Sequence, residues 1–354
     1  MNLDDYCPTV DLSRAATLPA RWYIDPEFLP LERRQIFGRT WQAVGHARDV
    51  ANPGDYFACE IAGEPVVVAR AKDGELRAFS NVCRHRASLI AEGKGSGPSL
   101  RCPYHNWTYS LEGRLLSQPE FEGVEDWDKD RICLPQFRVA VWGPFVFVNQ
   151  DAQAPSIDEV LGKIPSEVAS IGCEVGRLHF VERRDYLINC NWKVYIDNYL
   201  EGYHLPAAHP GLYRAVDYKQ YRVDTFAYYS SQYAPMRDGS GADALYYWIF
   251  PNFMLNIYPN NISSNIILPA GHDKTLTIFE WFAGRDMTAL PEGAIEFSDQ
   301  IQQEDIKICE SVQKGLHSTT YNQGRFSVKR ENGVHHFHLL LEKCLRGKFT
   351  CGSS

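Results

Sequence analysis

Two short pairs of cysteine and histidine have the residue types and the spacing of metal ligands. One residue separates Cys83 from His85, two separate Cys102 from His105, and sixteen lie between the pairs. Such a set can hold a [2Fe–2S] cluster, with two thiolates on one iron and two neutral imidazoles on the other, and the imidazoles raise the reduction potential. Structural zinc sites of the Cys2His2 type usually have both cysteines before both histidines. The interleaved order therefore favours a cluster, and zinc is the alternative.

A second set of candidate ligands lies near the end of a predicted helix over residues 190–204. In this helix Glu201 and His204 are neighbours on one polar face, because they are three residues apart. Pro206 is expected to break the helix, which would free His209 to fold back towards His204. Two histidines and one carboxylate are typical of a mononuclear non-haem iron site with open positions. The simpler interpretation of the same face is a polar surface exposed to water.

The carboxylate that would complete this set is expected in a long helix over residues 292–316, which offers Glu304 and Asp305. The apolar stripe of that helix consists of Phe297, Ile301, Ile308, Cys309, Val312 and Leu316. Asp305 falls near the centre of this stripe, and Glu304 falls near its edge. A buried carboxylate is costly unless a cation or a hydrogen-bond donor accompanies it. Asp305 is therefore the predicted iron ligand.

The two candidate sites fall in different parts of the chain. Residues 43–152 alternate short β-rich runs with turn residues, and this all-β region contains both Cys/His pairs. Residues 153–354 combine long helices with a strand-rich, aromatic block at 220–282, which predicts an antiparallel sheet wrapped on a long helix. Residues 1–42 are predicted to form an N-terminal segment that packs on this second domain. The predicted fold class is therefore α+β.

Four segments spread along the chain resemble one enzyme family. NVCRHRASLI and LRCPYHNWTYSLEG resemble the Rieske domain of ring-hydroxylating and related oxygenases. NWKVYIDNYLEGYHLPAAHP resembles the iron-binding motif of their catalytic domains, and QQEDIKICESVQKGL is similar to the corresponding helix of choline-monooxygenase-like proteins. The chain thus resembles a Rieske non-haem iron oxygenase α subunit, in the group of choline monooxygenases, carnitine monooxygenases and betaine demethylases.

The resemblance implies roles for individual residues. The implied ligands are Cys83, His85, Cys102 and His105 for a Rieske [2Fe–2S] cluster, and His204, His209 and Asp305 for a mononuclear Fe(II). Glu201 would relay electrons from the cluster of a neighbouring subunit, and Asp197 would steady the iron ligands or the electron path. Many ring-hydroxylating members have Asp at the position of Glu201, whereas carnitine- and choline-type oxygenases have Glu. This difference favours a small alkylammonium substrate over an aromatic ring.

The resemblance also implies a reaction and partners. The chain would be a terminal oxygenase that takes electrons from a separate NAD(P)H-dependent flavin and iron–sulfur reductase. It would use them with O2 to hydroxylate or N-demethylate a quaternary ammonium compound of the choline, betaine or carnitine type. A helix-grip, START-like catalytic domain and a homotrimer are expected. Two other functions stay open: a ring-hydroxylating dioxygenase α subunit with a small β partner, and a non-enzymatic electron-transfer protein.

Composition limits the remaining possibilities. The 354 residues carry a net charge of −8, which argues against a nucleic-acid partner, since phosphate contacts need clustered Lys and Arg. No apolar run is long enough for a membrane-spanning helix, and no signal peptide is expected. The ten cysteines favour metal ligation or burial in a reducing compartment, the cytoplasm, over a disulfide framework. The tract His335-His336-Phe-His338 is interpreted as surface and packing residues.

Overall fold

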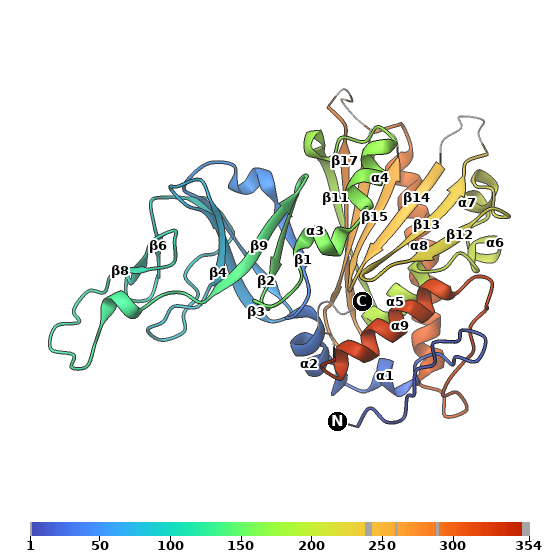
Figure 1. Ribbon diagram of the computed structural model, residues 1–354, viewed down its shortest axis with the longest axis horizontal. Coiled ribbons are helices and arrows are strands. Elements are labelled where there is room, and N and C mark those ends of the chain that lie inside the picture. Colours follow the sequence, from blue (N-terminus) through green and yellow to red (C-terminus); the bar gives the residue numbers. More distant parts are fainter. Residues whose placement is uncertain (1, 238–242, 259–260, 286, 288–289, 349–354) are drawn as a thin grey trace. The chain divides into compact units, whose positions relative to one another are not determined.

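The computed structural model describes residues 2–237, 243–258, 261–285, 287 and 290–348. The chain divides into two compact units (Figure 1). The small unit is Phe37–Ala154, and the large unit combines Met1–Ile36 with Pro155–Ser354. The sequence predicts boundaries after residues 42 and 152.

The small unit is built from β-strands, as predicted. Its main sheet has seven strands in the order β1-β10-β9-β4-β3-β2-β5, and a second sheet has the order β6-β7-β8. The strands are β1 Gln42–His46, β2 Asp55–Ile61, β3 Glu64–Arg70, β4 Leu76–Ser80, β5 Lys94–Ser96, β6 Leu100–Arg101, β7 Thr108–Tyr109, β8 Leu115–Ser117, β9 Gln136–Trp142 and β10 Phe145–Asn149. Short 3-10 turns lie at Ala47–Val50 and Lys129–Arg131.

Both faces of the main sheet of the small unit are covered by apolar side chains. Val67 packs in one buried cluster, and Val66 and Val68 pack in another on the opposite face. A strand that is buried on both faces carries a continuous apolar run rather than an alternating one. The VVV of β3 and the fully buried FVFVN of β10 follow this rule.

The large unit holds a seven-stranded antiparallel sheet in the order β11-β17-β16-β15-β14-β13-β12. The strands are β11 His179–Ile188, β12 Arg222–Thr225, β13 Tyr229–Pro235, β14 Asp243–Ile249, β15 Phe253–Tyr258, β16 Asn261–Pro269 and β17 Thr275–Ala283. The helices are α1 Arg21–Ile24, α2 Phe28–Glu32, α3 Ile157–Leu161, α4 Ile164–Ser170, α5 Trp192–Tyr199, α6 Leu205–Ala208, α7 Pro210–Ala215, α8 Ala294–Leu316 and α9 Asn332–Leu345. A π-helical turn, Arg33–Phe37, follows α2, and a 3-10 turn spans Val175–Arg177.

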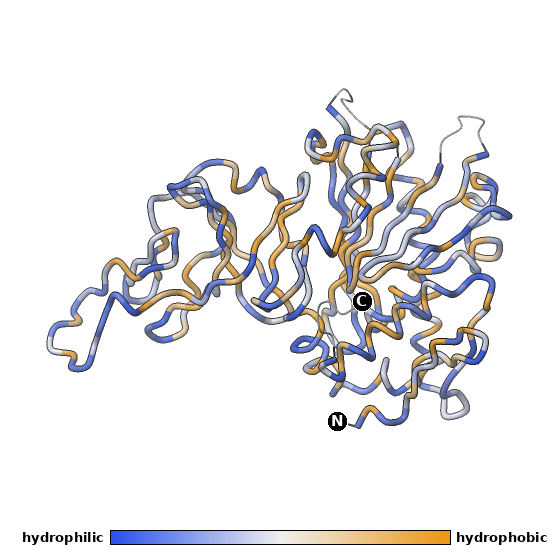
Figure 2. Tube along the Cα trace, in the orientation of Figure 1, coloured by the Kyte–Doolittle hydropathy of each residue, from blue (hydrophilic) through white to orange (hydrophobic). Residues whose placement is uncertain are grey.

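Helices α5 and α8 lie together against the sheet of the large unit. Helix α5 contacts β16, β17, α8 and α9, and α8 also contacts β11. In Figure 2 the hydrophobic colour is concentrated along the strands and the helix faces next to them, while most loops are hydrophilic. The predicted α+β fold class, with an antiparallel sheet packed against long helices, is confirmed.

The buried face of α8 differs in part from the predicted apolar stripe. Phe297 and Val312 are exposed, whereas Gln302 and Gln313 are buried. Gln302 donates to Thr277 Oγ1 at 3.0 Å, and Gln313 Oε1 accepts from the backbone N–H of Asn191 at 2.9 Å. The buried NH2 group of Gln313 has no hydrogen-bond partner among the described residues. Asp305 lies on this buried face between the two glutamines, in line with the prediction for its position.

The N-terminal segment is fixed to the large unit by a buried ion pair. Lys193 on α5 pairs with Glu32 on α2, and both side chains are almost completely inaccessible to solvent. The second carboxylate oxygen of Glu32 accepts from the indole N–H of Trp192 at 2.8 Å. Burial lowers the pKa of Lys193, and the charge of Glu32 offsets part of this effect. This pair anchors the start of α5, the helix that leads to the candidate iron ligands.

The cysteines of the described residues are all free thiols. In the same part of the chain, the structure has no helix whose length and apolar character would allow it to cross a bilayer.

Candidate metal centres and the adjoining cavity

The helix predicted over residues 190–204 ends earlier than expected, at Tyr199. Asn191 caps its start, since its side-chain oxygen accepts from the backbone N–H of Lys193 at 3.0 Å. Pro206 lies in the first turn of α6, where a missing N–H has no cost. Pro206 therefore begins a helix rather than ending one, and the prediction that Glu201 and His204 share a helix face is wrong.

A tight turn after α5 brings Glu201 and His204 together instead. The Glu201 carboxylate accepts from the backbone N–H groups of Tyr203 and His204, and its other oxygen accepts from the ring Nδ1–H of His204 at 2.6 Å. A Cβ on Gly202 would lie 2.5 Å from the ring of Tyr221, so this turn requires glycine. The turn holds the His204 ring with Nε2 as its free nitrogen.

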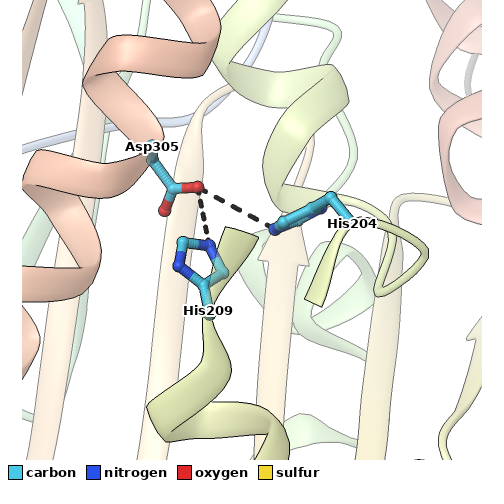
Figure 3. Close-up of side chains that lie close together, drawn as sticks. All are labelled: His204, His209 and Asp305. Carbon is cyan, nitrogen blue, oxygen red and sulfur yellow. Dashed lines mark hydrogen bonds and ion pairs between the residues drawn. The ribbon is translucent and has the colours of Figure 1, made fainter. Parts of the chain in front are cut away.

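Three side chains converge where α6, α7 and α8 meet, two of them five residues apart and the third about 100 residues further along the chain (Figure 3). One ligand atom each from His204, His209 and Asp305 lies within 4.8 Å of the other two. Asp305 Oδ1 is 2.9 Å from His209 Nε2 and 3.8 Å from His204 Nε2. Two imidazole nitrogens and one carboxylate that point at a common centre fit the ligand set of a mononuclear non-haem iron.

Neighbouring polar groups orient the three side chains of this triad. His209 donates its Nδ1–H to Glu304 Oε2 at 2.7 Å, and Asn198 donates to Asp305 Oδ1 at 2.7 Å. The sequence offers Glu304 as the alternative to Asp305 as an iron ligand. In the structure Glu304 contacts Nδ1 of His209, the ring nitrogen that points away from the centre of the triad. Burial alone would lower the pKa of His209, but the hydrogen bonds and charges of Asp305 and Glu304 outweigh it and raise this pKa. Burial alone would raise the pKa of Glu304, but the hydrogen bond from His209 outweighs this effect and the pKa is lowered.

Asp197 is in contact with the N-terminal segment and α9. Its carboxylate accepts from Tyr23 O–H at 2.6 Å and from His338 Nε2–H at 2.9 Å. The backbone N–H of Leu18 donates to His338 Nδ1 at 3.3 Å, which fixes the proton of His338 on Nε2. The role of His338 is not predicted from the sequence, because its tract offers several histidines on several helix faces. The apolar residues of α9 that share a helix face with His338 could have indicated that this histidine is buried.

The four predicted cluster ligands come from two loops of the small unit, after β4 and after β6. Cys83 and Cys102 are buried, and the rings of His85 and His105 are 4.6 Å apart. The loops have matching turns, since the backbone N–H four residues after each cysteine donates to its carbonyl at 3.1 Å. Within the described part of the chain, the buried Nδ1 of His85 has no hydrogen-bond partner. Two thiols and two imidazoles with an unpaired buried nitrogen fit a Rieske cluster.

Aromatic and hydroxyl groups surround the cluster ligands. The indole of Trp107 stacks on the His85 ring at 4.7 Å. The hydroxyl oxygen of Tyr109 accepts from the backbone N–H of Arg84 at 3.0 Å. It lies 3.3 Å from Cys83 Sγ, to which the hydroxyl can donate. Burial raises the pKa of Cys83, and the hydrogen bond from Tyr109 opposes this shift. The Tyr109 hydroxyl therefore favours the thiolate form that a metal requires.

A cavity of about 580 Å³ adjoins the triad of the large unit. Glu201, His204, His209 and Asp305 line it together with the aromatic side chains Tyr199, Tyr221, Tyr246, Tyr258, Phe279 and Trp281. The side chains of Tyr246 and Tyr247 alternate between the two faces of β14: Tyr246 lines the cavity, whereas Tyr247 donates to Glu167 Oε2 at 2.6 Å. Trp248 is buried and packs beside Phe337. This strand of the aromatic block therefore supplies both a wall of the cavity and residues of the packed core.

Two family descriptions match the chain. Residues 40–128 match the Rieske [2Fe-2S] domain, and residues 175–241 and 219–347 match the ring hydroxylating alpha subunit (catalytic domain). The chloroplastic choline monooxygenase of Arabidopsis thaliana is 38% identical over 365 residues, which cover 97% of this chain and 86% of that protein. The carnitine monooxygenase oxygenase subunit of Escherichia coli (strain K12) is 33% identical and covers 94% of each chain.

Solved structures give the same assignment. The quaternary ammonium Rieske monooxygenase CntA in complex with L-carnitine has a TM-score of 0.83 and 29% identity, covering 97% of this chain and 99% of that one. Naphthalene 1,2-dioxygenase from Rhodococcus sp. shares the fold, with a TM-score of 0.75 and 19% identity over 95% of both chains. This chain therefore belongs to the Rieske non-haem iron oxygenase α subunits, in the group of the choline and carnitine monooxygenases, as the oxygenase subunit of a Rieske-type monooxygenase.

Proposed function

We propose that this oxygenase hydroxylates or N-demethylates a small quaternary ammonium compound of the choline, betaine or carnitine type. The observation that supports this substrate class is the cavity beside the triad, which combines aromatic rings with carboxylates. Aromatic faces attract ammonium groups by cation–π interaction, and a negative cavity adds to that attraction. The relatives named above carry choline, carnitine or quaternary ammonium in their names.

The donor sets in the two units support an assignment of each cofactor to named residues. Cys83, His85, Cys102 and His105 would hold the [2Fe–2S] cluster, and His204, His209 and Asp305 would hold the mononuclear iron. When bound, these groups supply single electrons and activate O2 for attack on a C–H bond.

The side chains around the iron ligands hold protons and fix orientations. Glu201 and Glu304 accept the Nδ1 protons of His204 and His209, which directs both Nε2 atoms to the centre. Glu201 is hydrogen-bonded to the ring of His204. We therefore assign to Glu201 the electron relay that the family resemblance implies. Asp197 acts as a positioning residue, because it joins α5 to Tyr23 and His338.

The overall reaction balances with two electrons from a reductase. It is R–H + O2 + 2e⁻ + 2H⁺ → R–OH + H2O. Hydroxylation of a C–H bond next to nitrogen gives a hemiaminal-type product, which loses an aldehyde, so the same step produces N-demethylation. As an oxygenase subunit, the chain works with a separate reductase. We propose that the reductase is NAD(P)H-dependent, that the oxygenase is a homotrimer, and that the compartment is a reducing one.

The experiment that tests this function compares His204→Ala with the wild-type holoenzyme and reductase. Wild type should show O2 uptake that depends on a quaternary ammonium compound, with product or formaldehyde in proportion. His204→Ala should lose this coupled turnover and keep the visible spectrum of its cluster. The exposed His179 supplies a control, and His179→Ala should behave as wild type. Coupled turnover in His204→Ala with an intact cluster would refute the assignment.

A further inference from the structure

We propose that the cavity selects quaternary ammonium compounds whose second functional group is uncharged, an alcohol, over the analogues in which that group is a carboxylate. This inference rests on the proposed function and narrows the substrate class of the same site. It comes from the distribution of charge along the cavity wall and from a set of neutral hydrogen-bonding groups in it.

The charged side chains among the described lining residues are all carboxylates, and an Fe(II) held by the triad would offset two of these three negative charges. They are Glu201, Asp243 and Asp305, and none of the described lining residues is Lys or Arg. The sequence outside the described ranges, which is M at position 1, DGSGA, PN, D, TA and FTCGSS, also contains no Lys or Arg. A substrate carboxylate would therefore find no Lys or Arg partner among the described lining residues.

Arg330 and Arg237 are two of the arginines near the wall, and the guanidinium groups of both are engaged. Arg330 donates to the carbonyl oxygens of Tyr221 at 2.9 Å and Tyr218 at 3.2 Å, and it stacks over the Tyr218 ring at 4.2 Å. Arg237 follows the lining residue Met236 and pairs with Asp217 at 3.7 Å. Neither group faces the cavity as a free counter-charge.

Burying a carboxylate without a counter-charge is costly, and nearby carboxylates add repulsion. A compound such as glycine betaine carries its carboxylate close to the ammonium group, so both must enter the same cavity. The aromatic rings favour only the ammonium end. An alcohol of the same skeleton keeps the favourable end and avoids the unpaired negative charge.

A neutral polar network in the wall fits the alcohol. Tyr199 O–H donates to Asn256 Oδ1 at 3.1 Å, and Asn256 Nδ2 donates to Ser263 Oγ at 3.0 Å and to Asn265 Oδ1 at 2.9 Å. Asn256 and Ser263 are paired across strands β15 and β16, which holds the network rigid. Asn265 accepts through its carbonyl oxygen, which leaves its NH2 group to donate to a hydroxyl.

For such an alcohol the reaction is R–CH2OH + O2 + 2e⁻ + 2H⁺ → R–CH(OH)2 + H2O. One C–H bond of the alcohol carbon is broken and one C–O bond is formed. The second oxygen atom leaves as water, and the reductase supplies both electrons. The product is an aldehyde hydrate.

The test measures equilibrium binding to the oxygen-free holoenzyme by calorimetry. Choline is compared with glycine betaine, and γ-butyrobetaine is compared with the trimethylammonium alcohol of the same chain length. In each pair the alcohol should bind more tightly, by about tenfold or more. A carboxylate that binds as tightly as its alcohol would overturn this inference and leave the proposed function standing. Binding of neither member of either pair would overturn the proposed function, and this inference with it.

A designed counter-charge tests the cause of the selectivity. Met236→Lys adds an ammonium group to the partly buried side of the wall, and Met236→Gln is the neutral control of similar length. The ratio of the glycine betaine Kd to the choline Kd should fall by about tenfold in Met236→Lys and stay unchanged in Met236→Gln. The visible spectrum of the cluster verifies that both variants are folded. A wild-type ratio in Met236→Lys would overturn the explanation by charge.

Discussion

Each histidine of the triad donates its outer ring N–H to a glutamate. His204 contacts Glu201 and His209 contacts Glu304, at 2.6 and 2.7 Å. Carboxylates in this position fix the tautomer of a metal-binding histidine and raise its basicity. The two glutamates differ in their surroundings, because Glu201 also closes the turn that carries His204, whereas Glu304 lies on the long helix α8. Their contributions to iron binding can therefore be separated by mutation.

Replacement of Glu304 by Gln should weaken iron binding. The amide still accepts the Nδ1–H of His209 but lacks the negative charge, so the affinity for Fe(II) should fall about tenfold. Glu304→Ala removes the acceptor as well and should lose more. The Fe(II) Kd is measured by competition with a chelator on protein with its cluster loaded. Glu296→Gln, an exposed change on the same helix, is the control. Equal affinity in Glu304→Gln and Glu296→Gln would contradict the role of Glu304.

At the scale of single residues, the sequence predicts those ligands whose identity depends on local spacing. The four cluster residues are adjacent in pairs, and Asp305 follows from the phase of one helix, so both could be located from the sequence. Glu304 as a partner of His209, and His338 as a partner of Asp197, depend on contacts 95 and 141 residues apart. No periodicity encodes such pairs, so they cannot be predicted from the sequence.

Helix α5 illustrates why an element can be predicted in type and misplaced at its end. The polar positions after Tyr199 continue a helical pattern, so the sequence favours a helix to residue 204. In the structure Glu201 accepts backbone N–H groups of the next turn, which competes with helix formation. The predicted proximity of Glu201 and His204 is present in the structure through this turn rather than through a helix.

Helix α9 contains a histidine that should make the stability of the large unit depend on pH. Burial, with a smaller contribution from His335, lowers the pKa of His336 to about 4. The ordinary value in an unfolded chain is about 6.5, so the unfolded state binds more protons between these values. Stability should therefore be complete above pH ~6.5 and fall as the pH decreases towards ~4, by roughly 3 kcal/mol in total.

The variant His336→Phe isolates this effect. It removes the titrating group, keeps an aromatic ring beside Trp248, and should flatten the dependence of unfolding free energy on pH in this window. Urea unfolding at several pH values between 4 and 7 gives the measurement. His179→Asn changes an exposed histidine and should keep the wild-type slope. An unchanged slope in His336→Phe would show that other groups control acid stability.

At the scale of the whole molecule, each unit has a core of its own. The cluster ligands Cys83 and Cys102 belong to a buried cluster of the small unit that also contains Trp107 and Tyr109. The N-terminal segment belongs to the large unit, where Glu32 reaches Lys193 over 161 residues of sequence. The strand and helix patterns of the sequence predict the architecture of each unit. They do not predict an ion pair between residues as far apart as Glu32 and Lys193.

The change Glu32→Ala should destabilise the large unit and leave the cluster of the small unit in place. It removes the partner of Lys193, whose buried ammonium group is then uncompensated, at a cost of about 3–5 kcal/mol. Trp192 also loses the acceptor of its indole N–H. Thermal unfolding followed by near-ultraviolet circular dichroism should shift to lower temperature, while the visible absorbance of the cluster should bleach at the wild-type temperature. Glu27→Ala, an exposed change in the same segment, should leave both transitions unchanged. A parallel shift of both signals in Glu32→Ala would mean that the two units unfold together, and that the buried pair stabilises the whole oxygenase.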